Sequence, residues 1–372
     1  MQLEYFLVLL DKKVKKYIIY SIAAFMLACS SEDDFPVEVV NQELELSNFS
    51  IVSFDDDAFY EYRFNGATQE VLQFNLTEQQ GLSRQVFLID RNESVFGFYG
   101  PGNAFVKDFE TNDLIFVDDF GGEPGEQRIT ARNDIETLGI IYTFENTDEH
   151  FIRVIDISLN FQFEIFLGNF GSDVSLHVKG DDLFVINNNQ AGSQLFKISK
   201  TAGAITQMLE FGTAMSGVVF GDNETIFLFD FTGNYIELAQ NNLTELSTGT
   251  NGFIPDSRVT HKYEDGVIFS EFQYPQPDFY SIGPAAFNLV TGEEFNINIA
   301  NIFDDYKLDN PETLTISPVH FDYDTVNQVW IVAFTAQNAS QVERFGYFVI
   351  NDNQEILRET PLDRLPWTVT VY

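Results

Sequence analysis

The sequence predicts an all-β protein, a β-propeller of about seven four-stranded blades. From about residue 49 to the end, short runs of alternating apolar and polar residues are separated by Asp, Asn and Gly. The runs are rich in aromatic and β-branched residues, which is typical of strands. They also repeat at nearly constant spacing, and a repeated unit of four strands is what a propeller blade needs. Six blades, eight blades and a pair of β-sandwich domains remain as alternatives.

Residues 1–28 have the layout of a secretory signal peptide. Four lysines between positions 12 and 16 precede the apolar run Tyr17–Ala28. A basic segment, a short apolar run and a small residue before the cleavage point are typical of such signals. The run would form a helix of about 18 Å, which is too short to cross the hydrocarbon core of a membrane. Met1–Asp11 precedes the basic segment, and a misassigned start codon would explain it.

Cys29 is the single cysteine of the chain and directly follows Leu27 and Ala28. Leu-Ala-Cys behind such a run resembles the lipobox of bacterial lipoproteins, whose cysteine carries fatty acids such as palmitate. The resemblance implies that a lipid on Cys29 attaches the protein to a membrane. Because no cysteine follows, the mature chain has neither a disulfide nor a thiolate metal site, and packing must stabilise it.

Residues 29–48 are predicted to form an acidic, flexible tether, and residues 49–372 the propeller. Ser30-Ser31-Glu32-Asp33-Asp34 follows the cysteine, and polar and acidic residues continue to about Ser47. An acidic run at this place also resembles the export signal of surface-exposed lipoproteins in the Bacteroidota. This resemblance implies an outer-membrane lipoprotein at the cell surface, with the periplasm-facing side of that membrane as the other location.

The repeat is the main argument for the propeller. Strand runs centred near Phe96, Ile140, Leu183, Ile226 and Val267 follow one another at 44, 43, 43 and 41 residues. One unit reads Val174–Lys179, Leu183–Ile186, Gln194–Lys200 and Ala204–Phe211 as four strands. Counting the units backward and forward along the chain gives seven.

Two segments depart from the repeat. The interval between Val267 and Val329 is 62 residues, so it must contain an insertion. Proline cannot donate a hydrogen bond within a central strand, so the prolines of Tyr274–Pro284 predict the insertion in that segment. Ala300–Leu308 is expected to form a helical turn or two. The terminal Trp367–Tyr372 has no nearby partner in the sequence. We expect it to complete the first blade beside Ala58–Phe64 and so close the ring without a covalent bond.

The formal net charge of −37 limits the partners of this chain. Such a field repels phosphate backbones, so we expect no nucleic acid partner. The sequence contains no G-x-S-x-G, H-E-x-x-H, P-loop or dinucleotide fingerprint. Asp90-x-Asn92-x-Ser94 begins like a calcium loop, but it lacks the turn glycine and the final carboxylate, so we interpret it as a hairpin turn.

Three histidines fall at similar places in three repeats: His177, His261 and His320. Each is expected at the end of the first strand of its unit, and first strands line the central channel of a propeller. Neutral imidazoles that converge there, together with carboxylates, would hold a divalent cation. We expect no other cofactor. The simpler interpretation is that these histidines form ordinary hydrogen bonds in a packed interior.

Exposed aromatic residues among the prolines of the insertion are a second candidate site: Tyr274, Phe279 and Tyr280. They are suited to stacking on a glycan or contacting a protein. The sequence therefore favours a lipid-anchored binding or scaffolding propeller at the outer membrane, without an assigned ligand or catalytic residue. A metal-assisted polysaccharide lyase or hydrolase that uses the three histidines is one alternative. A structural component of an envelope assembly is the other.

Overall fold

The computed structural model describes residues 44–86, 88–92, 95–100, 103–117, 122–157, 161–169, 173–255, 261–273 and 282–372. The predicted signal peptide, Cys29, most of the tether and the aromatic residues Tyr274, Phe279 and Tyr280 lie outside these ranges. The described chain belongs to one compact unit, Glu45–Tyr372. It contains two helices, α3 (Leu76–Gln80) and α4 (Ile299–Asp309), and neither is long and apolar enough to cross a membrane.

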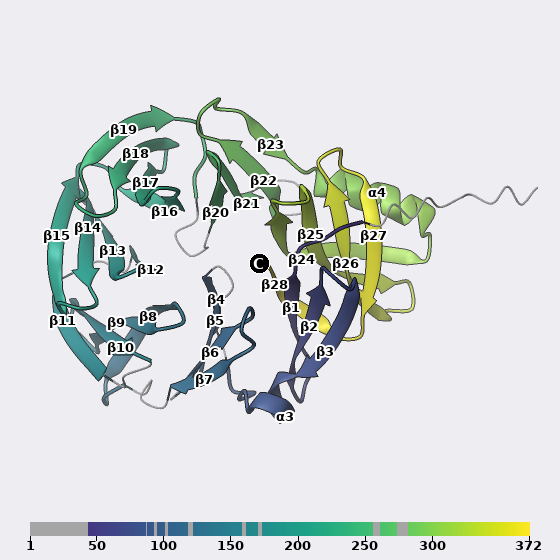
Figure 1. The fold of residues 1–372 in the computed structure, drawn as a ribbon, viewed down its shortest axis with the longest axis horizontal. Helices are drawn as coiled ribbons and strands as arrows, with labels where there is room; N and C mark the ends of the chain where they lie inside the picture. The colour runs from purple at the N-terminus through teal and green to yellow at the C-terminus, as the bar shows by residue number, and fades with distance from the viewer. Residues whose placement is uncertain are drawn as a thin grey trace, which may run out of the picture. The chain divides into compact units, whose positions relative to one another are not determined.

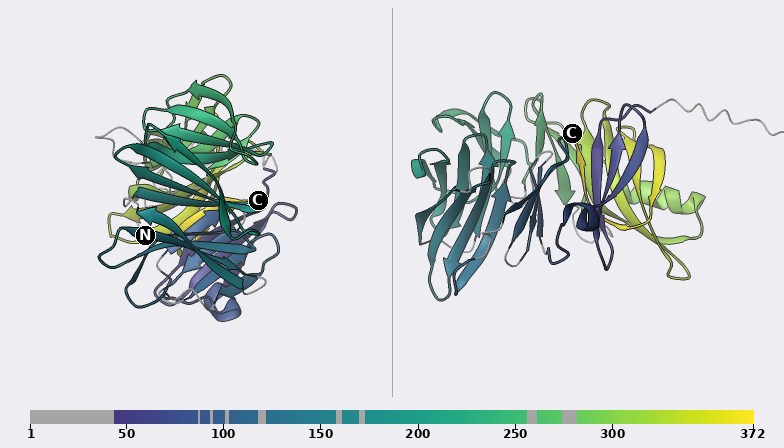
Figure 2. Two further views of the ribbon diagram at one scale, coloured as in Figure 1. Left: turned by 90° about the vertical axis from the view of Figure 1, so that its left-hand side faces the viewer. Right: turned by 60° about the horizontal axis from the view of Figure 1, so that its bottom comes forward.

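The strands form seven separate four-stranded antiparallel sheets that stand around a common centre (Figure 1). Side views show each sheet as a twisted blade that runs from one face of the ring to the other (Figure 2). The protein is therefore an all-β propeller with seven blades, as predicted. The six-bladed, eight-bladed and two-sandwich alternatives are wrong.

In blades 1 to 4 the strands follow one another from the centre of the ring outward. Blade 1 contains β28 (Leu365–Val371), β1 (Phe49–Phe54), β2 (Phe59–Asn65) and β3 (Glu70–Asn75). Blade 2 contains β4 (Leu88–Asn92), β5 (Val95–Tyr99), β6 (Ala104–Asp108) and β7 (Leu114–Val117). Blade 3 contains β8 (Glu126–Asn133), β9 (Thr137–Phe144), β10 (Glu149–Asp156) and β11 (Phe161–Asn169). Blade 4 contains β12 (Asp173–Lys179), β13 (Asp182–Asn189), β14 (Gly192–Ser199) and β15 (Ala204–Phe211).

The remaining three blades have the same order. Blade 5 contains β16 (Met215–Gly221), β17 (Thr225–Asp230), β18 (Asn234–Ala239) and β19 (Glu245–Thr250). Blade 6 contains β20 (Lys262–Glu264), β21 (Val267–Gln273), β22 (Ile282–Asn288) and β23 (Glu294–Asn296). Blade 7 contains β24 (Thr313–Asp324), β25 (Val329–Asn338), β26 (Glu343–Asn351) and β27 (Ile356–Leu362). The five runs that define the predicted repeat are β5, β9, β13, β17 and β21, the second strand of each blade.

The last strand closes the ring, but its neighbour differs from the prediction. β28 pairs with β1, for example Val369 with Ile51, and β1 in turn pairs with β2. The expected pairing of Trp367–Tyr372 with Ala58–Phe64 is therefore wrong by one strand. β1 gave no alternating signal because it is buried on both faces along nearly its whole length. In addition, Phe49 packs on Tyr347 of blade 7 with ring centroids 5.3 Å apart.

The long interval before blade 7 includes α4, which lies between β23 and β24. The sequence pattern predicts the insertion at Tyr274–Pro284 and only a turn or two at Ala300–Leu308, so it underestimates an 11-residue helix. Asn298 caps the helix by accepting a hydrogen bond from the Asn301 N–H at 3.1 Å. The buried side chains of α4 recur at helical spacing: Ile299, Ile302, Phe303 and Tyr306. Pro311 then prevents continuation.

Adjacent blades bury their apolar side chains against each other. One such cluster lies between blades 4 and 5 and includes Ile186, Leu228 and Leu238. The largest fully buried side chains are mostly aromatic, including Phe59, Phe96 and Phe98. Phenylalanine therefore forms much of the core between blades. These contacts make the ring a scaffold that fixes the positions of its centre and of its two faces.

Candidate functional site

The three candidate histidines lie at the centre of the ring, but they do not share one cavity. His177 is in β12, His320 is in β24, and His261 directly precedes β20. His177 and His261 line one cavity of about 20 Å³, whereas His320 lines another of about 30 Å³. The expected position at the end of a first strand does not hold for His261, which lies before β20, and the metal role stays a prediction.

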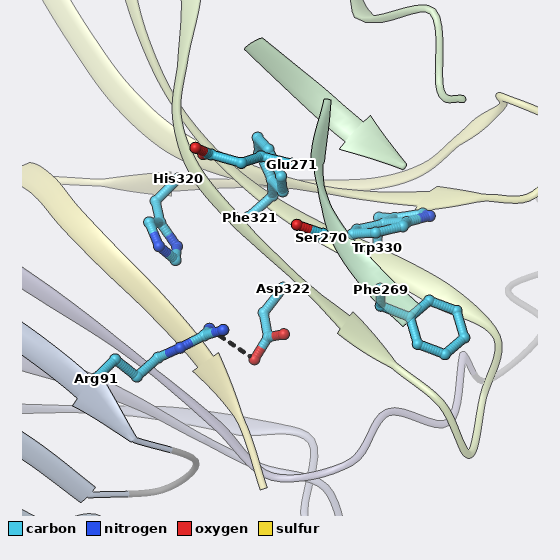
Figure 3. Close-up of a pocket in the computed structure, with 8 residues that line it drawn as sticks. All are labelled: Arg91, Phe269, Ser270, Glu271, His320, Phe321, Asp322 and Trp330. Atoms are coloured by element: carbon cyan, nitrogen blue, oxygen red, sulfur yellow. Dashed lines mark ion pairs between the residues drawn. The ribbon is translucent and has the colours of Figure 1, made fainter. Parts of the chain in front are cut away.

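The larger central cavity contains an ion pair between blades 2 and 7 (Figure 3). Arg91 of β4 reaches toward Asp322 of β24, with Nη1 and Oδ2 3.1 Å apart. The His320 ring lies near the guanidinium, and the rings of Phe269 and Trp330 lie together beyond Asp322. Only 16% of the Arg91 side chain and 7% of the Asp322 side chain are exposed, so solvent screens the pair weakly.

The same groups hold the closing strand β28. The Val371 N–H donates to Asp322 Oδ2 at 2.8 Å, and Arg91 donates to the Val369 carbonyl at 2.9 Å. The Val369 N–H donates to His320 Nδ1 at 3.2 Å, so this nitrogen is an acceptor and Nε2 carries the proton of the neutral ring. His320 therefore has a structural partner, since it ties the last strand to blade 7.

The smaller cavity lies beside a second central ion pair, between Arg132 of β8 and Asp90 of β4. Asn92 adds hydrogen bonds from Nδ2 to the carbonyls of Asn133 at 3.0 Å and Val178 at 3.2 Å. Asp90 and Asn92 belong to strand β4, so their interpretation as turn residues is wrong, and Ser94 lies outside the described residues. Burial raises the pKa of Asp90 to about 6, although Arg132 opposes this.

The histidines beside this cavity have different environments. His261 Nδ1 lies 2.6 Å from Ser270 Oγ, within hydrogen-bonding distance. His177 is buried, and its Nε2 has no hydrogen-bond partner among the described residues. Burial and the nearby Arg132 lower the pKa of His177 to about 3, and burial and Arg91 lower the pKa of His320 to about 3. Both rings are therefore neutral at physiological pH.

The two central cavities have room for one or two water molecules and not for a sugar ring. In the described part of the chain, no three His, Cys, Asp or Glu side chains are grouped so that they could hold a metal ion. The arrangement is therefore suited to holding seven blades in register. The sequence did not reveal the roles of Arg91 and Asp322, because a single charge in a strand gives no sign of a partner more than half the chain away.

A much larger hollow, which no pattern in the sequence indicated, lies in blade 5. It has a volume of about 500 Å³ and is bounded by the start of β16, the end of β17, the start of β18 and the end of β19. We call it the blade-5 groove. Its lining includes Asp230, Asn234, Tyr235, Ile236, Thr248 and Thr250. This volume is within the range of small-molecule binding sites.

Comparisons with known proteins give a likeness of fold alone. No family model and no curated protein matches the chain. It is similar to a solved dihydro-heme d1 dehydrogenase NirN, with 9% identity and a TM-score of 0.48 over 88% of this chain and 75% of that one. It is also similar to BamB from Moraxella catarrhalis, with 12% identity and a TM-score of 0.37 over 86% of this chain and 90% of that one. Because these identities and TM-scores are low, the assignment of seven blades depends on the strand pairing observed in this chain.

Proposed function

We propose that the protein is a lipid-anchored, extracytoplasmic propeller at the outer membrane that binds a glycan or protein partner at its surface. One observation carries this proposal. The centre of the ring, where many channel-based sites would lie, is occupied by two nearly buried ion pairs and leaves cavities of about 20 and 30 Å³. A partner of any size must therefore meet a face of the ring or its rim.

The described chain enters the ring at one face. Ser47 donates to Asp324 through its N–H at 2.7 Å and through its hydroxyl at 2.8 Å, which fixes the chain at the end of β24. The other end of this 12-residue strand, near α4, lies roughly 35 Å away along the strand. We call the face at which β24 begins the α4 face, and the proposed tether would join the ring at the opposite face.

Cell fractionation of a Cys29→Ser variant tests the anchor. We expect the variant to leave the membrane fraction, because no other attachment is proposed, while the wild-type chain stays in the outer membrane. Added protease should also cleave the wild-type chain on intact cells. A Cys29→Ser protein that remains in membranes would rule out the lipid anchor, and protection of the wild-type chain on intact cells would assign it to the periplasmic side.

A metal-assisted lyase or hydrolase is the second candidate, and one observation favours it. The unpartnered Nε2 of His177 belongs to a ring that lines the same small cavity as His261. Elemental analysis of the purified chain, with His177→Ala and His261→Ala variants as controls, tests this candidate. A stoichiometric divalent metal that both variants lose would support it. An absence of metal after purification in zinc, manganese or calcium would exclude it.

A further inference from the structure

The blade-5 groove is separate from the central channel and opens on the face opposite Ser47. It is formed where β16 begins and β17 ends. Consecutive blades are related by rotation about the ring axis, so β16 begins on the same face as β24, the α4 face. Ser47 is fixed at the far end of β24.

The polar rim of the groove is held in place before any ligand arrives. Asp230 Oδ1 accepts hydrogen bonds from the Thr232 N–H at 2.8 Å and the Asn234 N–H at 3.0 Å, and Asp230 Oδ2 accepts from Asn234 Nδ2 at 2.9 Å. Asn234 Oδ1 in turn accepts from the Thr250 hydroxyl at 2.7 Å. Although burial opposes them, these hydrogen bonds lower the pKa of Asp230, so the carboxylate is ionised at neutral pH. The rim is therefore a fixed array of hydroxyl, amide and carboxylate groups.

The floor of the groove is apolar. Leu228 and Met215 are buried there, and Ile236 is half-buried. The Tyr235 ring is not part of this floor, because it packs on Phe227 and Phe229 on the other face of the sheet, with ring centroids 5.8 and 5.6 Å apart. Phe231, in the same turn as Asp230, is 55% exposed. An aromatic ring in water beside a polar rim is a surface on which an amphipathic ligand can stack.

We propose that the blade-5 groove binds a neutral carbohydrate, with a sugar ring on the exposed Phe231 and its hydroxyls on the Asp230–Thr250 rim. A pyranose presents apolar C–H faces and polar edges, which matches this floor and rim. The groove lining contains no Lys, Arg or His among the described residues, and the chain carries a net charge of −37. Anionic sugars and phosphorylated ligands would therefore be repelled. This proposal rests on the proposed binding function and names its ligand class and site.

Calorimetric titration of the purified full chain with cellohexaose, maltohexaose, mannohexaose and xylohexaose tests the proposal, with polygalacturonate as the anionic probe. We expect at least one neutral oligosaccharide to bind and polygalacturonate not to bind. Thr248→Trp places an indole in the groove from an exposed strand position, so binding should fall below detection. Phe231→Ala removes the exposed ring and should weaken binding by about tenfold.

Leu246→Trp is the matched control, because Leu246 is an exposed residue of the same strand outside the groove lining. It should bind like the wild type, and circular dichroism should show all three variants to be folded. The proposal is overturned if none of the neutral oligosaccharides binds, if polygalacturonate binds instead, or if folded Thr248→Trp retains affinity. The anchor experiment is independent of this test. If Cys29→Ser is released from membranes but the protein binds no sugar, the carbohydrate proposal fails and the proposal of a lipid-anchored scaffold stands.

Discussion

The centre of the ring and the blade-5 groove are built from the same four-stranded unit, yet they are opposites in polarity and access. At the centre, Arg91–Asp322 and Arg132–Asp90 connect side chains that are 4% to 16% exposed. In the groove, the side-chain hydrogen bonds of Asp230 stay within one short turn, and Thr248 and Thr250 are exposed. The first region joins side chains of different blades, whereas the second remains open to solvent.

This difference shows how the fold separates stability from recognition. Buried charges at the centre are costly to leave unpaired, so they enforce the correct relation between blades 2, 3 and 7 and the closing strand. The polar side chains of the groove are held by local turns, so replacing a residue that contacts the ligand should leave the packing of the ring unchanged. Variants in the centre should affect folding and variants in the groove should affect binding.

The largest effect is expected from Asp322→Ala. It leaves Arg91 without its carboxylate in a weakly solvated place and removes the acceptor of the Val371 N–H. We expect the free energy of unfolding to fall by about 3–5 kcal/mol, the usual cost of removing one partner of a buried pair. Urea denaturation followed by circular dichroism measures this change.

Asp304→Ala is the control for Asp322→Ala. Asp304 pairs with Lys307 at 2.7 Å on the surface of α4, and its side chain is 68% exposed. Loss of this pair should cost less than about 1 kcal/mol. Equal effects of the two substitutions would contradict the structural role of the central ion pair.

A smaller effect is expected in the pH dependence of stability. An unfolded histidine has a pKa of about 6.5, whereas the pKa of His177 in the fold is about 3. Between these values the unfolded chain binds more protons, so stability falls as the pH drops below 6.5, by about 1.4 kcal/mol per pH unit for this group. Asp90, with its raised pKa, acts in the opposite sense between about pH 4 and 6.

Comparison of the wild type with His177→Gln isolates this contribution, because Asp90 is common to both. Urea midpoints between pH 4 and 7 should fall less steeply in the variant. Identical slopes in the two proteins would mean that folding does not lower the pKa of His177, which would contradict its buried, neutral environment.

A smaller effect on stability than that of Asp322→Ala is expected from Gly249→Ala beside the groove. The new methyl group would press on the Tyr235 ring, which can move because it is a half-buried side chain and not backbone. We expect a loss of about 1 kcal/mol in the free energy of unfolding. Oligosaccharide affinity should stay at the wild-type value, because the methyl group and the Tyr235 ring lie on the face of the sheet opposite the groove. Calorimetry on the same sample measures the affinity, and a loss of binding would contradict this placement of Tyr235.

Much of the fold could be predicted because each blade repeats its strand pattern. Leu183 and Ile226 mark equivalent second strands, and turns such as Gly180-Asp181-Asp182 separate them from the first strands. Two elements were misjudged for physical reasons. β1 is buried on both faces and therefore shows no period of two, and α4 carries acidic residues between its buried positions, which made its apolar face hard to recognise.

The sites were less predictable because they depend on three-dimensional packing. His177, His261 and His320 all lie at the ring centre, yet the repeat could not show that they line two different cavities or that His320 contacts Val369 of the closing strand. The groove combines a turn at Asp230–Asn234 with residues of the next strands, and each segment alone has the composition of an ordinary loop or edge strand. These segments line one hollow only because they lie side by side in the folded blade.

Oligosaccharide affinity measured side by side in Thr248→Trp and His177→Gln tests most directly whether recognition lies on blade 5 and the ring centre serves folding. We expect the tryptophan variant to be as stable as the wild type and to bind no sugar. The glutamine variant should show altered pH-dependent stability and bind with wild-type affinity. Loss of binding in His177→Gln with retention in Thr248→Trp would assign recognition to the centre and contradict this division of roles.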